Sequence, residues 1–376
     1  MILRSVNAAV LALVAGTAVG GPYLPQDDSA VLAEVTPGTR HSELATRQVA
    51  AQRLDIALPL AQLYIKQARN TGDLRFLGYA EAVLGPWTGS DATSADALVL
   101  HATVLQSRHD FSGALAVLER ARALRPNDAQ AWLTSATVLR VLGEYERALA
   151  ACDSIADAAV VELCEQGIRG LSGDLASAYA AIQQIDSQGM PPEERAWRDS
   201  ELGEMAVRMG RDVEAEHWFQ NGLRASPGDF YIRAAYADLL LRNGRAREAL
   251  VLLKGQESLE PLLLRIAIAQ KMLRDPGLEQ SNARLAAAFA AEAQRGDGVH
   301  RREEARFLLE VRGDPRAALA AALENWKVQR EPDDVLVLLR AAQGAGMPQA
   351  AQPAAAFVRE HGVQDVRIAT LTGARS

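Results

Sequence analysis

Six histidines are the residues of this chain best suited to metal or acid–base chemistry, and they are spread along its whole length. Their positions are His41, His101, His109, His217, His300 and His361. His101 and His109 are closest in sequence, but a separation of eight residues places them about 80° apart around a helix. The sequence also has no phosphate-binding glycine loop, nucleophile elbow or metalloprotease helix. We therefore expect no catalytic, cofactor-binding or metal-binding site.

Cys152 and Cys164 are the only cysteines. Neither has a histidine nearby in sequence, so together they would fill only half of a zinc coordination shell. Two outcomes remain open, which are a disulfide and a pair of buried thiols that stay reduced. The choice between them depends on the elements that carry the two residues.

A unit of about 34 residues with a two-helix pattern recurs along the chain. Units that begin at Ala95 and Ala129 align in register, as do units that begin at Ala196 and Phe230. Position eight of each unit is small, and so is position twenty. The residues are Ala102, Ala136, Gly203 and Ala237 at position eight, and Ala114, Ala148, Ala215 and Ala249 at position twenty. Small residues at these two positions let paired antiparallel helices approach closely, while larger apolar residues between them seal one pair against the next.

This pattern resembles the tetratricopeptide-repeat family. The resemblance implies an all-α fold, a right-handed superhelical solenoid of antiparallel helix pairs whose concave groove holds peptides or protein segments. Glycines before a polar residue mark the turn inside further, weaker units. We expect these weaker units near residues 159–190, 261–297, 299–332 and 333–362, so that the repeat array spans residues 95–362. Residues 41–94 are predicted to form an atypical helical cap with Pro59 inside a helix, and residues 363–376 a tail without a repeat signature.

The amino-terminal segment indicates export. Arg4 precedes an apolar stretch from Val6 to Val19, which is typical of a secretory signal peptide over residues 1–20. The alternative is an uncleaved amino-terminal anchor, and either reading places the repeats outside the cytoplasm. Residues 21–40 read as a flexible linker, and no later stretch is long and apolar enough to cross a membrane. We expect an exported bacterial protein, periplasmic or secreted.

The repeat register places the two cysteines on adjoining helices. Cys152 falls in the second helix of one unit and Cys164 in the first helix of the next, across a short connection. In an exported protein this placement favours a disulfide, although two buried thiols remain the alternative.

Inward-facing positions follow from the resemblance, since the second, fifth, ninth and twelfth residues of the first helix line the groove in that family. The candidate partner-binding residues are Gln130, Thr137, Arg140, Trp197, Glu204, Tyr231 and Asp238. Trp197 and Tyr231 occupy equivalent positions and are either an aromatic anchor for a partner or packing residues of the neighbouring hairpin. First helices also tend to end in arginine, as at Arg140, Arg208 and Arg242, which favours helix capping over a basic ladder along the groove.

The net charge of −7, with basic residues scattered among acidic ones, argues against a nucleic-acid partner. We expect a non-catalytic protein-interaction scaffold of the bacterial envelope that binds an unknown protein or peptide segment in the groove without a cofactor. A narrower alternative is a component of an envelope export or assembly complex. An alternative from another class is an enzyme, or an accessory to one, with its site in the irregular segment 259–312.

Overall fold

The computed structural model describes residues 47–71, 73–295 and 300–373. The predicted signal peptide or anchor, the linker and the first residues of the predicted cap lie outside these described residues. Every regular element within them is a helix, so the fold is all-α and of the tetratricopeptide type. Among the described residues, no helix is both long enough and apolar enough to cross a membrane.

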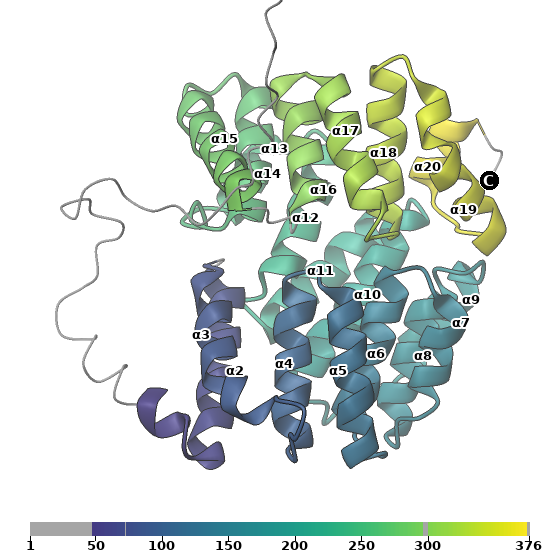
Figure 1. Cartoon of the computed structure of the whole chain (residues 1–376). Helices are drawn as coiled ribbons and strands as arrows, with labels where there is room; N and C mark the ends of the chain where they lie inside the picture. Colours follow the sequence, from purple (N-terminus) through teal and green to yellow (C-terminus); the bar gives the residue numbers. More distant parts are fainter. Residues whose placement is uncertain (1–46, 72, 296–299, 374–376) are drawn as a thin grey trace, which may run out of the picture.

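Helices follow one another in antiparallel pairs along the chain (Figure 1). The α-helices are α2 (Leu54–Thr71), α3 (Arg75–Leu84), α4 (Ala95–Ser107), α5 (Phe111–Leu124), α6 (Ala129–Val141), α7 (Tyr145–Cys152), α8 (Ala158–Arg169), α9 (Leu175–Gln184), α10 (Pro192–Arg208), α11 (Asp212–Ala225), α12 (Phe230–Arg242), α13 (Ala246–Leu252), α14 (Glu260–Leu273), α15 (Leu278–Arg295), α16 (Arg301–Arg306), α17 (Pro315–Trp326), α18 (Pro332–Gly344), α19 (Gln352–His361) and α20 (Val366–Thr372). Short 3-10 turns cover Gly85–Trp87 and Pro348–Ala351, and a π-helical turn, Phe307–Arg312, extends α16.

The small residues that define the repeat lie where the paired helices touch. Ala102, Ala136 and Ala237 on the first helices are at most 1% exposed. Gly203 shows how little room there is, because a Cβ added to it would lie 2.4 Å from Cε1 of Phe219 on the partner helix. A carboxylate begins many of the helices by accepting a backbone N–H, as Asp128 does from Ala131 at 2.9 Å.

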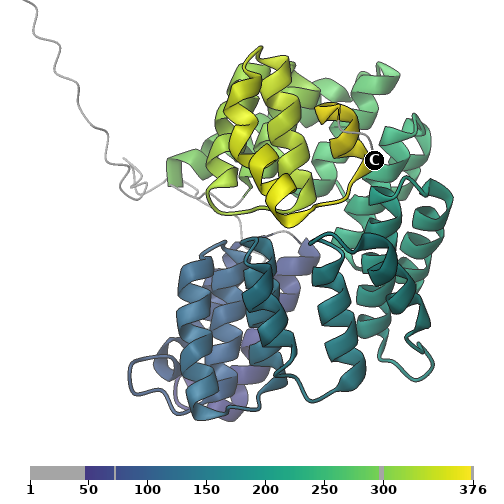
Figure 2. The same ribbon diagram turned by 90° about the vertical axis from the view of Figure 1, so that its right-hand side faces the viewer.

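The chain curls round until its last helices meet its early ones (Figures 1 and 2). Helices α17–α20 lie against the ends and turns of α6–α9, and one hydrophobic cluster runs through both sets. The backbone N–H of Arg330 donates to the carbonyl of Val141 at 2.9 Å, and the N–H of Leu175 donates to Oε1 of Gln364 at 3.2 Å. We call the contact between α6–α9 and α17–α20 the closure interface.

Aromatic packing holds the closure interface together. The Phe357 ring on α19 lies 6.0 Å from that of Tyr145 on α7, between ring centroids. The Phe357 ring also lies so close to Gly143 that a Cβ there would be 2.7 Å from the ring. Gly143 is therefore required for two reasons. It leaves room for the Phe357 ring, and its φ of +76° suits the turn between α6 and α7.

Both ends of the array depart from the repeat. The cap contains α2, with Pro59 inside it, and α3, which form a hydrophobic cluster of their own with α4. In the tail the structure has a helix, α20, that the sequence did not indicate. Val363 and Ile368 are buried in the cluster that spans the closure interface, and these tertiary contacts rather than any repeat pattern order the tail.

Candidate functional site

The inner side of the curl is lined by polar residues from several repeats. Trp197, Glu201, Glu204 and Arg208 are spaced four, three and four residues apart on α10, so they share one face of that helix. The guanidinium of Arg140, from α6, contacts the carboxylate of Glu201. The indole N–H of Trp197 donates to the same carboxylate at 3.3 Å.

Tyr231, at the start of α12, lies opposite this face of α10. Its hydroxyl interacts with the nearby carboxylate of Glu204, while the residue remains 46% exposed. Burial of the hydroxyl and the nearby charges of Glu204 and Glu331 raise the pKa of Tyr231 well above its usual value. An aromatic ring is thus presented to solvent beside charges from α10 and α18. We call Arg140, Glu201, Glu204 and Tyr231 the anchor cluster.

The anchor cluster holds more negative than positive charge. Burial and the neighbouring Glu201 raise the pKa of Glu204 to about 7, although Arg140 and the Tyr231 hydroxyl act to lower it. Glu331, which immediately precedes α18, also lies within electrostatic reach of Glu204, and its own carboxylate is paired with Arg302. At neutral pH the Glu204 carboxylate is therefore incompletely compensated, and an incoming cation would lower its pKa.

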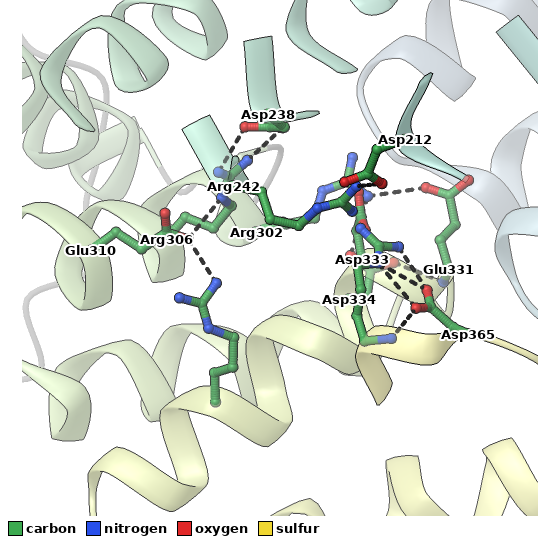
Figure 3. A network of polar contacts seen from close by, with 12 residues as sticks. Asp212, Asp238, Arg242, Arg302, Arg306, Glu310, Glu331, Asp333, Asp334 and Asp365 are labelled. Carbon is green, nitrogen blue, oxygen red and sulfur yellow. Dashed lines mark hydrogen bonds and ion pairs between the residues drawn. The ribbon is translucent and has the colours of Figure 1, made fainter. Parts of the chain in front are cut away.

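Asp238, further along α12, lies in a second cluster with arginines from two later helices, of which Figure 3 shows Arg306. Arg265 of α14 contacts the Asp238 carboxylate at 2.7 Å, and Arg306 of α16 contacts it at 2.9 Å. Burial alone would raise the pKa of Asp238, but these two guanidinium groups hold it well below its usual range. Asp238 is a saturated acceptor, which marks a structural junction between α12, α14 and α16.

A third cluster joins the carboxyl-terminal helices (Figure 3). Arg302 contacts Glu331 at 3.1 Å and Asp334 at 3.5 Å, while Arg367 contacts Asp365 at 2.7 Å and Asp333 at 3.0 Å. These ion pairs connect α16, α18 and the residues around α20. They fix α18, and with it Glu331, next to the anchor cluster.

The structure places the predicted inward-facing residues in three groups. Arg140, Glu204 and Tyr231 come together in the anchor cluster, and Asp238 lies among the arginines. Trp197 is half-buried, packs against hydrophobic clusters and also contacts Glu201, so it combines packing with a polar contact. That any of these residues binds a partner stays a prediction.

Gln130 and Thr137 lie apart from both clusters. Both are exposed on α6, where Gln130 donates to Thr134 at 3.2 Å and Thr137 donates to the carbonyl of Leu133 at 2.9 Å. Their printed hydrogen bonds stay within their own helix.

Several members of the clusters were not found from the sequence. Arg265 is the fifth residue of the weaker unit that begins at Pro261, so the inward-facing rule would have found it had we extended it to that unit. Arg302 and Arg306, four residues apart in a charged run, share a helix face. Glu201 gave no such signal, because it falls outside the inward-facing positions.

The helix-terminal arginines lie in the last turns of their helices, as the capping interpretation requires, and they also contact other helices. Arg140 pairs with Glu201, and Arg242 pairs with Asp212 at 2.5 Å, in each case on another helix. Arg208 does cap a helix end, but it is that of the neighbouring α8, where it donates to the Gly170 carbonyl at 2.7 Å. These arginines therefore connect different helices.

The two cysteines are adjacent at the junction of α7 and α8. Their sulfur atoms are joined and their Cα atoms lie 5.8 Å apart, a spacing that suits a disulfide. Both side chains are buried. The formation of this bridge in solution is tested below.

One group of side chains among the described residues has the composition and spacing of potential metal ligands. Glu260, Glu292 and His300 come from different elements, and one donor atom of each lies within 4.8 Å of the others. Histidine spacing could not reveal this group, because two of its three members are glutamates separated along the chain.

Comparison with known proteins agrees with this architecture. Residues 105–162, from α4 into α8, match the family model described as "Tetratricopeptide repeat". This segment carries the tetratricopeptide-repeat signature, and the fold of the described residues is all-α and tetratricopeptide-like. No curated protein matches its sequence.

Solved structures similar to this chain have low sequence identity to it. The Cut9–Hcn1 hetero-tetramer of APC/C is 12% identical over 89% of this chain and 69% of that one, with a TM-score of 0.49. Pseudomonas aeruginosa pilF is 16% identical over 67% of this chain and 96% of that one, with a TM-score of 0.30. The P58(IPK) TPR domain is 16% identical over 84% and 97% of the respective chains, with a TM-score of 0.23.

Proposed function

We propose that this protein is a non-catalytic scaffold that binds a segment of another protein at the anchor cluster. Tetratricopeptide repeats generally mediate protein–protein interaction, which gives the class of function. The observation that supports the location is Tyr231, a large aromatic side chain left 46% exposed while its hydroxyl is held by Glu204. Fixed, partly exposed aromatic residues are enriched among the residues that dominate binding energy.

The charges around Tyr231 favour a basic segment as the partner. An arginine or lysine side chain laid against the ring would gain a cation–π contact and would lie near the Glu204 carboxylate. Glu201 and Glu331 are already paired with Arg140 and Arg302, so Glu204 is the carboxylate of this group without an arginine ion pair among the described residues. A basic side chain would offset the burial and the repulsion from Glu201 that raise the pKa of Glu204.

Substitution of the anchor cluster tests this proposal. The partner is captured by cross-linking in the native cell and identified, and its binding to purified protein is then measured. Tyr231→Ala and Glu204→Gln are each expected to weaken binding about tenfold or more. Val213→Ala, at a site 86% exposed on α11, is the matched control and should bind normally.

A loss of binding identifies the interface only if the variant protein stays folded. Helicity and melting temperature of Tyr231→Ala should stay close to the parent, because the ring is not part of a hydrophobic core. Trp197→Ala is less suitable, since that side chain packs against core clusters. Normal binding by a folded Tyr231→Ala protein would place the interface elsewhere.

We also propose that the scaffold works outside the cytoplasm, in the bacterial envelope or secreted. The amino-terminal segment supports export, and the cysteine pair suits an oxidising compartment. A role in an envelope export or assembly complex is the narrower form of this proposal. Sequencing the amino terminus of the mature protein tests it, and recovery of the intact chain from the cytosol would contradict it.

A further inference from the structure

Three potential metal ligands converge where α14, α15 and α16 meet. Glu260 is the first residue of α14, Glu292 lies in α15, and His300 immediately precedes α16. Nδ1 of His300 is 2.5 Å from Oε1 of Glu292 and 3.6 Å from Oε2 of Glu260. Glu292 is only 6% exposed, so its carboxylate is committed to this group and not to bulk water.

We propose that Glu260, Glu292 and His300 form a binding site for a divalent transition-metal ion, with Zn²⁺ the best fit. One imidazole nitrogen and two carboxylate oxygens are a donor set that Zn²⁺ accepts in protein sites. A water molecule would supply a fourth ligand. The ion would connect α14, α15 and the start of α16.

The geometry needs only side-chain adjustment to hold an ion. Ligands about 2.1 Å from a tetrahedral ion lie about 3.4 Å from each other. The His300–Glu260 distance of 3.6 Å is already close to that value. The His300–Glu292 distance must widen by about 1 Å from its present 2.5 Å, which rotation of the glutamate side chain can provide.

The charges around His300 favour a cation at this position. Burial acts to lower the pKa of His300, but hydrogen bonding to Glu292 and the charges around it raise the pKa to about 9. The carboxylates that raise it belong to three helices, and they are Glu292, Glu303 and Glu260.

Calorimetric titration with ZnCl₂ tests the site. The full chain without a histidine tag is freed of metal with a chelator and titrated at pH 7.5. We expect saturable binding of one ion per chain. Replacement of Zn²⁺ by Co²⁺ should give visible absorption bands of a mixed nitrogen and oxygen shell.

Variants separate the metal site from a simple ion pair. His300→Gln and Glu260→Gln should each weaken Zn²⁺ binding at least tenfold, and Glu260, at 31% side-chain exposure, is the milder change. His217→Gln, on α11, is the matched control. Absence of saturable binding below about 1 mM, or binding unaffected by both substitutions, would mean that His300 and Glu292 form an ion pair only. Either result leaves the anchor-cluster proposal untouched, because these substitutions lie outside it.

Discussion

Glu204→Gln is expected to make the protein more stable at alkaline pH while weakening its binding. The pKa of Glu204 is about 7 in the folded protein, against an ordinary value of 4.5. The folded state therefore holds its proton more tightly than the unfolded state does. Ionisation costs stability as pH rises from about 4.5 to 7, and glutamine removes that cost while keeping an acceptor for the Tyr231 hydroxyl.

The size of the expected gain in stability follows from the change in the pKa of Glu204 on folding. A rise of the Glu204 pKa from 4.5 to about 7 corresponds to at most about 3 kcal/mol. Water reaches the anchor cluster and screens the charges, so we expect a gain of about 1–2 kcal/mol at pH 8. At pH 5 the gain should be small, because Glu204 is then largely protonated in the folded protein.

Urea unfolding at pH 5 and pH 8 measures this difference. Glu119→Gln, at an exposed position of α5, is the matched control and should change stability little at either pH. A loss of stability at pH 8, or an equal gain at both values, would refute the electrostatic reasoning. A gain confined to pH 8 together with weaker partner binding would identify Glu204 as a residue kept for function at the expense of stability.

Three further predictions concern the fold. Gly203→Leu should cost about 3 kcal/mol or more in thermal unfolding, because even a Cβ would clash with Phe219, and an unchanged melting temperature would disprove the repeat register. Phe357→Ala should cost about 3–5 kcal/mol, since its ring is 7% exposed within the closure interface, and near-neutral unfolding data would show that this interface contributes little. Reduction of the Cys152–Cys164 bridge should cost about 3 kcal/mol, and detection of two free thiols by mass after alkylation of the unfolded, unreduced protein would exclude the bridge.

The repeat pattern predicted the helix pairs because its signals are local. Small residues such as Ala136 and turn glycines such as Gly143 act within one hairpin, so a single sequence displays them. The anchor cluster was found in part for the same reason. Arg140, Glu204 and Tyr231 stand at inward-facing positions of units that align well.

The contacts between distant helices could not be predicted, because they depend on how far the array curls. Glu331 approaches Glu204, and Phe357 covers Gly143, only because small rotations between successive repeats add up to bring α17–α20 onto α6–α9. No local sequence pattern determines this accumulated rotation between repeats. The same holds for Glu260, Glu292 and His300, whose convergence requires three helices to be placed first.

Closure also restricts how this protein can vary in length. An open solenoid can gain or lose a whole repeat, since each unit contacts only its neighbours. Here an extra repeat between α9 and α16 would carry α18–α20 past α6–α9 and break the bond from Arg330 to Val141. Repeat duplication and deletion, the ordinary route by which such arrays diversify, are therefore costly within this segment. Homologues that keep the closure interface should keep the same repeat number between its two halves and vary at the amino-terminal cap.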